Sequence, residues 1–103
     1  MRLYLVEEGD RLVWVAGPAH EVMYAYVANT GTFHNNNALR NDFYMVLNFT
    51  YEQIGPAAAR RLIAQGVGTL DDDEDLTALA KWRSDPNPLS PADVLAVAAG
   101  SNE

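Results

Sequence analysis

Cysteine is absent from the 103 residues of the sequence, which excludes disulfide bonds, thiolate metal ligands and thiol nucleophiles. Histidine is scarce as well: the chain contains His20 and His34, and their spacing from carboxylate residues matches no metal-ligand pattern. We therefore expect neither a metal ion nor another cofactor. The glycine-rich phosphate loops, serine nucleophile motifs and dinucleotide fingerprints of common enzyme classes are also missing.

Long apolar runs are missing too. After Met1 the first apolar segment covers residues 3–6, which is far too short for a secretory signal or a membrane-spanning helix. We therefore expect a cytoplasmic protein with no membrane segment. Lysine is nearly absent, since Lys81 stands beside six arginines, and this usage is typical of a GC-rich bacterial or phage genome.

Positive charge is outnumbered, because 14 acidic residues against 7 basic ones give a net charge of −7. The imbalance is concentrated in residues 67–103, which hold eight of the acidic residues and two of the basic ones. Nucleic-acid phosphates repel a protein of this sign, so we do not expect nucleic acid as a partner. The field of the protein attracts a basic protein instead.

The chain does have enough apolar material for a core of its own. Hydrophobic residues make up 49% of it, ten residues are aromatic, and its length is that of one domain. The sequence contains no internal repeat. We predict a single α+β domain over residues 1–100, followed by a polar tail at 101–103.

Two apolar segments, residues 3–6 and 12–16, are separated by a polar stretch in which Gly9 begins a turn. This pattern predicts a β-hairpin. A two-residue turn at that point places Leu5 opposite Trp14. Both faces of the resulting hairpin are apolar. Such a hairpin needs cover on each side, from helices of the same chain or from another subunit.

The segment that follows the hairpin fits two structures. Residues 18–29 begin with a proline and contain several alanines, which favours a helix, whereas the shorter stretch 22–27 also fits a strand. We predict the helix. Further along, residues 43–49 are almost continuously apolar and predict a central strand.

Capping residues and prolines predict the helices in the second half of the chain. After a short turn at 51–54, we expect helices at 56–65, 72–84 and 90–99, the last with Ser90 as its N-cap. The predicted fold is thus α+β. Its small sheet has about three strands, made of the N-terminal hairpin and the central strand, with three to four helices packed on it.

A loop around His34 is the strongest candidate for catalysis. His34, Arg40 and Asp42 combine a proton shuttle, a cation that can hold a phosphate and a carboxylate, which is what a small toxin-like hydrolase or ribonuclease needs. The alternative is a surface loop in which asparagines 35–37 form turns and Arg40 pairs with Asp42. Because the spacing matches no catalytic template, we favour the surface loop and do not expect an enzyme.

An acidic run begins at the helix expected over 72–84. Its first half imitates a calcium-binding loop, but Leu76 stands where that loop requires glycine, so we expect no calcium site. The run is then either a solvated helix start or a docking surface for a basic partner. The residues of this candidate docking surface are Asp71, Asp72, Asp73, Glu74 and Asp75.

The aromatic and strand residues have more apolar surface than so small a domain can bury. The alternative is that they line one core with their polar atoms outward. Tyrosine and tryptophan often anchor protein interfaces. The predicted interface consists of Tyr4, Val13, Val15, Tyr24, Tyr44 and Trp82. We therefore predict a small acidic protein-interaction module, a regulator or inhibitor that binds a basic protein or self-associates into a homo-oligomer. The alternative is the hydrolase or ribonuclease built on His34, Arg40 and Asp42.

Overall fold

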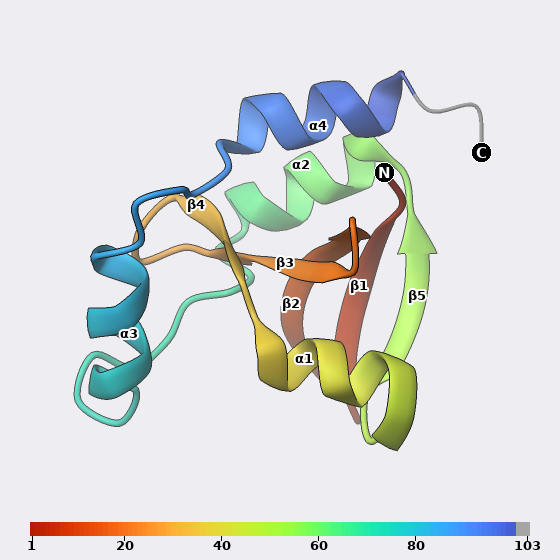
Figure 1. The fold of residues 1–103 in the computed structure, drawn as a ribbon. Coiled ribbons are helices and arrows are strands. Elements are labelled where there is room, and N and C mark those ends of the chain that lie inside the picture. Colours follow the sequence, from red (N-terminus) through yellow and green to blue (C-terminus); the bar gives the residue numbers. More distant parts are fainter. Residues whose placement is uncertain (101–103) are drawn as a thin grey trace.

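Five strands form one sheet in which all neighbouring strands are antiparallel (Figure 1). The computed structural model describes residues 1–100, and the polar tail expected at 101–103 lies outside them. The strands are β1 (Leu3–Glu8), β2 (Arg11–Ala19), β3 (Val22–Val27), β4 (Thr32–Asn35) and β5 (Thr50–Ile54). Their order across the sheet is β4-β3-β2-β1-β5.

Four α-helices and one π-helical turn complete residues 1–100. They are α1 (Asn37–Asn41), the π-helical turn η1 (Asp42–Val46) that continues it, α2 (Pro56–Ala64), α3 (Leu76–Arg83) and α4 (Pro91–Ala99). The predicted α+β class is confirmed. The prediction of about three strands is wrong, because segments expected to form a helix, a surface loop and a turn pair as strands β3, β4 and β5.

The helices predicted from capping signals are present. The segments expected at 56–65 and 90–99 are α2 and α4, and the one expected at 72–84 begins later, at Leu76. At the start of α4 the Ser90 hydroxyl accepts a hydrogen bond of 3.1 Å from the backbone N–H of Asp93. Local signals at helix ends were sufficient here, because both the cap and the first-turn proline act within a few residues.

The helix predicted over 18–29 is wrong. Strand β2 continues to Ala19, and β3 pairs with it directly, with Val22 opposite Ala19. The turn between them consists of His20 and Glu21, whose φ angles of 51° and 67° are those of the tight turn that connects twisted strands. This turn usually contains asparagine or glycine. Histidine and glutamate occupy it here, so the usual residue signal for a hairpin turn is missing.

The central strand predicted at 43–49 is also wrong, since this apolar run forms η1 and the loop after it. The Asn36 side chain caps α1 by accepting a hydrogen bond of 3.0 Å from the N–H of Leu39. Asp42 then holds residues 48 and 49 close to the start of η1, because its carboxylate accepts hydrogen bonds from the N–H groups of Asn48 and Phe49. Side chain–backbone bonds thus override the strand preference of the apolar residues.

The outermost strand replaces the turn predicted at 51–54. Strand β5 pairs with β1, and Tyr51 lies opposite Val6. Tyr51 and Ile54 are half-buried and the other three residues of β5 are exposed, which is typical of a strand at a sheet edge.

The first hairpin is present, but its register differs from the prediction. The pairing shifts between Val6 and Glu7, which leaves Val13 as an extra residue and puts Val6 opposite Trp14. The predicted pairing of Leu5 with Trp14 is therefore wrong. A one-residue shift exchanges the faces of a strand, so the bulge moves Trp14 to the side of the sheet that Val6 faces.

Each face of the sheet has its own hydrophobic core, covered by its own helices (Figure 1). On one side Leu3 and Val15 pack with Ala59 of α2 and Val94 of α4. On the other side the β-hairpin packs with α1, α3 and the residues around η1. The buried members of this second core are Val6, Trp14, Ala16, Met23, Ala25, Val27, Leu39 and Leu79. The Cα radius of gyration, 12.7 Å, is that of one compact domain of this length.

Candidate functional site

Strand β4 carries His34 into the interior, where the residue is 2% exposed. Its Nδ1–H donates a hydrogen bond of 2.8 Å to Oδ2 of Asp85, in the connection between α3 and α4. Its Nε2 lies 2.7 Å from Oγ1 of Thr30 and 2.9 Å from Oγ1 of Thr32. The ring of Trp82 stacks on the imidazole at a centroid distance of 6.1 Å. Both ring nitrogens therefore have protein partners, and the ring is shielded from substrate.

The partner of this histidine is an ionised carboxylate. The hydrogen bond from His34, followed by one from the backbone N–H of Asn87, holds the pKa of Asp85 below its ordinary value. The same connection pairs with β4 a second time, because Phe33 and Leu89 exchange two backbone hydrogen bonds, of 2.8 and 2.9 Å. The arrangement fastens the C-terminal segment to the sheet, which is a structural role.

Asp42, the second residue of the predicted catalytic group, is buried in a separate network. Its carboxylate accepts hydrogen bonds from the Tyr51 hydroxyl at 2.6 Å and from the N–H groups of Asn48 and Phe49 at 2.9 and 3.1 Å. Burial alone would raise the pKa of Asp42, but these three hydrogen bonds outweigh it and keep the pKa below its ordinary value. Burial and the neighbouring Asp42 carboxylate in turn raise the pKa of the Tyr51 phenol.

Arg40, the third member, is exposed and contacts neither of the other two. Its Nε–H donates to the backbone carbonyl of Glu21, and its guanidinium lies 5.7 Å from the ring centre of Tyr44. The structure therefore does not assemble His34, Arg40 and Asp42, because each side chain is held by different partners. The group of residues that a small hydrolase or ribonuclease needs is not formed.

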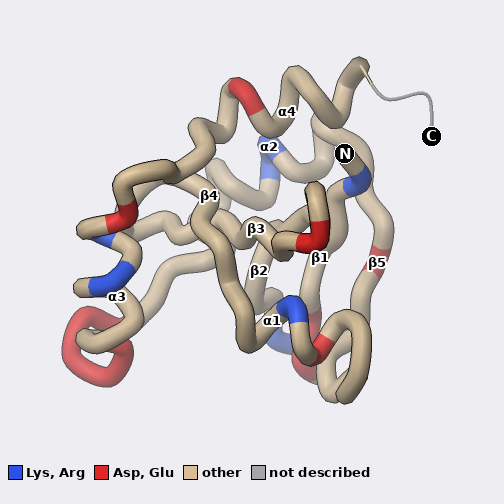
Figure 2. The backbone as a smooth tube through the Cα atoms, in the orientation of Figure 1, with Lys and Arg blue, Asp and Glu red and all other residues tan. Residues whose placement is uncertain are grey.

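The acidic run lies in the exposed turn before α3, where Figure 2 shows a continuous acidic loop. Oδ1 of Asp71 accepts hydrogen bonds from the N–H groups of Glu74 and Asp73, which lower the pKa of Asp71. Asp72 forms an ion pair of 2.9 Å with Arg83. Within residues 1–100 no group of three or more histidine and carboxylate residues is arranged to hold a metal ion.

The residues of the predicted interface differ in their exposure to solvent. Val15 is fully buried and so lies outside any surface of the folded protein, whereas Tyr4, Val13, Tyr24 and Trp82 are half-buried. Tyr44 is exposed. The protein's own helices cover both faces of the hairpin, so no other subunit is needed to cover them.

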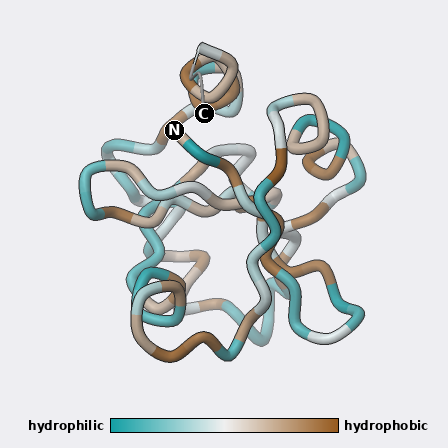
Figure 3. Tube along the Cα trace, turned by 90° about the vertical axis from the view of Figure 1, so that its right-hand side faces the viewer, coloured by the Kyte–Doolittle hydropathy of each residue, from teal (hydrophilic) through white to brown (hydrophobic). Residues whose placement is uncertain are grey.

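Tyr44 instead marks an apolar surface that the sequence did not reveal. Tyr44, Met45, Val46 and Leu47 follow one another on and after η1, and each is between 50% and 75% exposed. We call these four residues the 44–47 ridge. Figure 3 shows it as a hydrophobic stretch at the lower left of the molecule, in the region of η1. The sequence predicted a central strand at residues 43–49 instead, because a continuous apolar run usually marks a buried strand.

Ring packing and hydrogen bonds hold the base of the 44–47 ridge. Phe43, directly before it, is half-buried and packs its ring at 5.4 Å from Tyr4 and 4.9 Å from Tyr51. At its other end Leu47 has a left-handed backbone, with φ of 58°, and its N–H donates to the Asp42 carbonyl at 2.8 Å. A leucine in this conformation costs about 1 kcal/mol. Strained residues and π-helical turns both occur preferentially at functional sites.

A groove of about 470 Å³ runs beside the ridge, between the β1–β2 hairpin, α1 and α3. Apolar side chains supply most of its walls: Trp14, Ala38, Leu39, Val46, Phe49 and Trp82. The indole rings of Trp14 and Trp82 meet edge to face at a centroid distance of 6.0 Å. Trp82 also lines a hollow of about 350 Å³ on its other side, together with Lys81 and Asp85.

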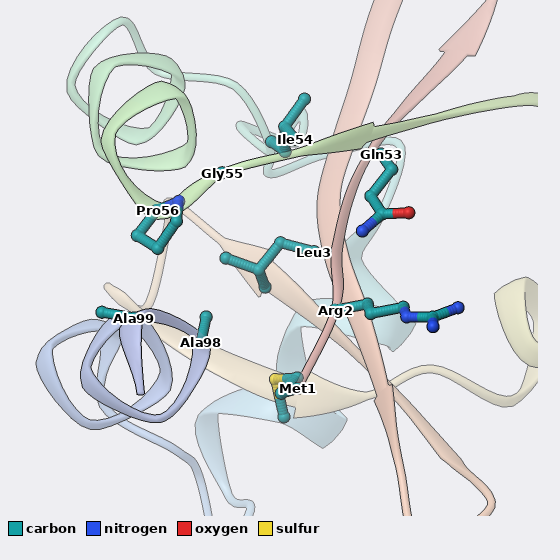
Figure 4. Close-up of a pocket in the computed structure, with 9 residues that line it drawn as sticks. All are labelled: Met1, Arg2, Leu3, Gln53, Ile54, Gly55, Pro56, Ala98 and Ala99. Carbon is teal, nitrogen blue, oxygen red and sulfur yellow. The ribbon is translucent and has the colours of Figure 1, made fainter. Parts of the chain in front are cut away.

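A further hollow of about 390 Å³ lies between the start of β1, the end of β5 and α4 (Figure 4). Of the residues in its described lining, Arg2 is the one with a charged side chain, and that side chain points away from Pro56 and Ala99. Because the residues within 1–100 that line it include no carboxylate or histidine side chain, they form no acid–base pair there.

Comparison of the chain with protein-family models, with curated protein sequences and with solved structures returned no match. Within residues 1–100, no helix has the length and apolar character needed to cross a membrane.

Proposed function

We propose that this protein is a non-enzymatic interaction module that binds a basic protein partner through the 44–47 ridge. The observation that carries the proposal is the exposure of four consecutive large apolar residues on a turn whose base is fixed. Exposing such residues to water is unfavourable, and contiguous exposed apolar surface on a small protein usually marks a contact site.

The other large apolar residues that are exposed lie singly on the surface, which sets the ridge apart. Within residues 1–100 they are Leu12, Leu76 and Val97, which lie on β2, α3 and α4 and form no run. Scattered apolar residues of this kind are normal on a protein surface. The 44–47 ridge therefore differs from the rest of the described surface by being continuous.

The fixed base of the ridge supports a role in binding. Asp42 holds both ends of the turn, because its carbonyl accepts from Leu47 and its carboxylate accepts from Asn48 and Phe49. A surface that is already ordered loses little conformational entropy when it binds. The conformational entropy of ordering the ridge is thus lost when the protein folds and not when the partner binds.

The charge of the chain favours a basic partner over a second copy. Each molecule carries a net charge of −7, so two copies repel one another at long range. A basic partner is attracted by the same field, and its encounter rate depends on salt. The acidic run 71–75 adds to this attraction whether or not it touches the partner.

A photo-crosslinking experiment tests this function. A photoreactive amino acid replaces Met45, which is 75% exposed, in the protein expressed in its native cells. The matched controls carry the same amino acid at Leu76 or Val97, which are 62% and 58% exposed and lie outside the ridge. We expect one dominant adduct with a basic protein from position 45 and none from the control positions.

Two outcomes contradict the proposal. Equal labelling from all three positions shows that exposure alone determines the adducts. An adduct consisting of two copies of this chain shows that the ridge mediates self-association, which sedimentation velocity of the purified protein would confirm as a concentration-dependent dimer.

A further inference from the structure

We infer that the groove beside the 44–47 ridge receives a large apolar side chain from a cationic segment of the partner protein. The inference rests on the proposed function and specifies the chemistry of the segment that binds. Its basis is the combination of apolar walls, a carboxylate at the rim and no cationic lining residue.

The size and walls of the groove suit an apolar side chain. Its volume of about 470 Å³ is within the range of sites that enclose small organic groups. Trp82 presents its ring and not its N–H to a ligand, because that N–H donates to the backbone carbonyl of Asn35 at 3.2 Å. Val46 belongs to both the ridge and the groove, so one partner segment can contact the two surfaces together.

The two buried polar residues of the groove, Asn36 and Asp42, have partners within the protein. Asp42 already accepts three hydrogen bonds, and the side-chain oxygen of Asn36 accepts one from Leu39. Neither residue offers the acid–base chemistry of a catalytic site. The groove is therefore suited to burying apolar surface and not to transforming a substrate.

The charge at the rim determines the sign of the flanking residues on the partner. Among the lining residues within 1–100, Glu8 and Asp42 are charged, and there is no lysine, arginine or histidine. Glu8 has Arg11 as a partner at 3.9 Å, and both side chains are exposed, so this ion pair is weak. Glu7 and Asp10 lie within two residues of Glu8 in the same β1–β2 hairpin. A lysine or arginine beside the inserted side chain would pair with Glu8, whereas an acidic segment would be repelled.

The two tryptophans of the chain provide the measurement, because Trp14 and Trp82 both line the groove. Two synthetic helical peptides of equal length, without tryptophan or tyrosine, carry the same leucine stripe. One has lysine and arginine, and the other glutamate, at its remaining positions. Each is titrated into the protein while tryptophan emission is recorded at low and high salt.

We expect the cationic peptide to shift the emission to shorter wavelength and to bind more weakly as salt increases, and the acidic peptide to cause no change. Glu8→Gln should weaken binding of the cationic peptide about two- to fivefold, which is the usual size of one exposed charge pair. Val46→Asp should weaken it about tenfold or more, since it places a charge on the apolar wall. Val97→Asp on α4 is the matched control and should bind as the unaltered protein does.

Three results would overturn the inference. Failure of the cationic peptide to bind, or equal binding of both peptides, removes the charge argument. Unchanged affinity of Val46→Asp shows that the peptide attaches elsewhere, for example at the acidic run 71–75. If position 45 crosslinks a partner and the cationic peptide does not bind, the proposed function stands and the assignment of the groove fails. If neither occurs, both are wrong.

Discussion

The Nδ1–H of His34 donates to Oδ2 of Asp85 at 2.8 Å, across 51 residues of sequence. This bond joins β4 to the segment between α3 and α4. Two Thr hydroxyls at the other ring nitrogen and the stacked ring of Trp82 complete the surroundings of the histidine. A residue selected from the sequence as a proton shuttle is thus a fastening point of the fold.

Replacing each of the two histidines by asparagine tests whether His34 fastens β4 to the segment between α3 and α4. His34→Asn removes a buried ring and its hydrogen bonds, so we expect it to lower the free energy of unfolding by about 2–4 kcal/mol. His20→Asn lies on an exposed turn with φ of 51°, a conformation that asparagine accepts readily, so its effect should be within about 0.5 kcal/mol. Urea denaturation measures both. Equal effects of the two substitutions would argue against the fastening role.

Acid should weaken the fold through Asp42 and Asp85. A carboxyl group whose pKa is lower in the folded than in the unfolded chain stabilises the fold above its unfolded pKa. It loses that contribution as the pH falls toward the folded pKa. Both groups have a pKa below their ordinary value of 3.8, so the free energy of unfolding should decline as the pH drops below that value.

Asp42→Asn separates the contribution of Asp42 from that of Asp85. The variant should be less stable at neutral pH and should lose less stability in acid, because one of the carboxyl groups with a lowered pKa is gone. Urea denaturation at a series of pH values gives the slope. An Asp42→Asn variant with the same slope as the unaltered protein would show that Asp42 does not titrate with folding.

The backbone strain at the ridge predicts opposite effects of glycine at two neighbouring positions. Leu47→Gly removes the cost of a left-handed leucine, so stability should stay constant or rise by up to about 1 kcal/mol. Met45→Gly lies within the π-helical turn and should cost about 0.5–1 kcal/mol. Both side chains are exposed, so burial contributes little to either value. Thermal unfolding compares the two, and a larger loss at Leu47 would show that its side chain stabilises the fold.

Two glycines with positive φ separate backbone strain from steric collision. At Gly31, with φ of 74°, an added Cβ has no other atom within 4 Å, so Gly31→Ala should cost about 1 kcal/mol. At Gly68, with φ of 94°, the added Cβ collides with the backbone carbonyl of Tyr26, so Gly68→Ala should cost more than about 2 kcal/mol. Urea denaturation gives both values, and equal costs would mean that the chain near Gly68 moves aside freely.

The parts of the fold that the sequence predicts correctly depend on local signals. Ser90 and Pro91 determine the start of α4 by contacts within one helical turn. The incorrect parts depend on distant or unusual interactions. The β2–β3 turn lacks the residues that normally accept positive φ, and residues 43–49 become a turn because Asp42 bonds to the backbone beyond them.

The candidate site shows the same division. The favoured surface loop around His34 is wrong, because His34 and Asp42 are both buried and hydrogen-bonded and Arg40 has other partners than Asp42. Their partners, Asp85 and Tyr51, could not be selected from the sequence, because folding alone determines which carboxylate or hydroxyl reaches each of them. The ridge was missed because its four apolar residues have the composition of a core strand.

The hydrogen bonds between Phe33 and Leu89 also affect how the protein is made. Leu79 and Val94, from the last quarter of the chain, are buried in opposite cores, so neither face of the sheet is complete before they arrive. A nascent chain whose residues 79–94 are still inside the ribosome therefore has β4 without its outer neighbour and both cores open to water. The sheet and its two cores are therefore completed only after residue 94 has left the ribosome, and a chain truncated before residue 89 lacks the outer neighbour of β4.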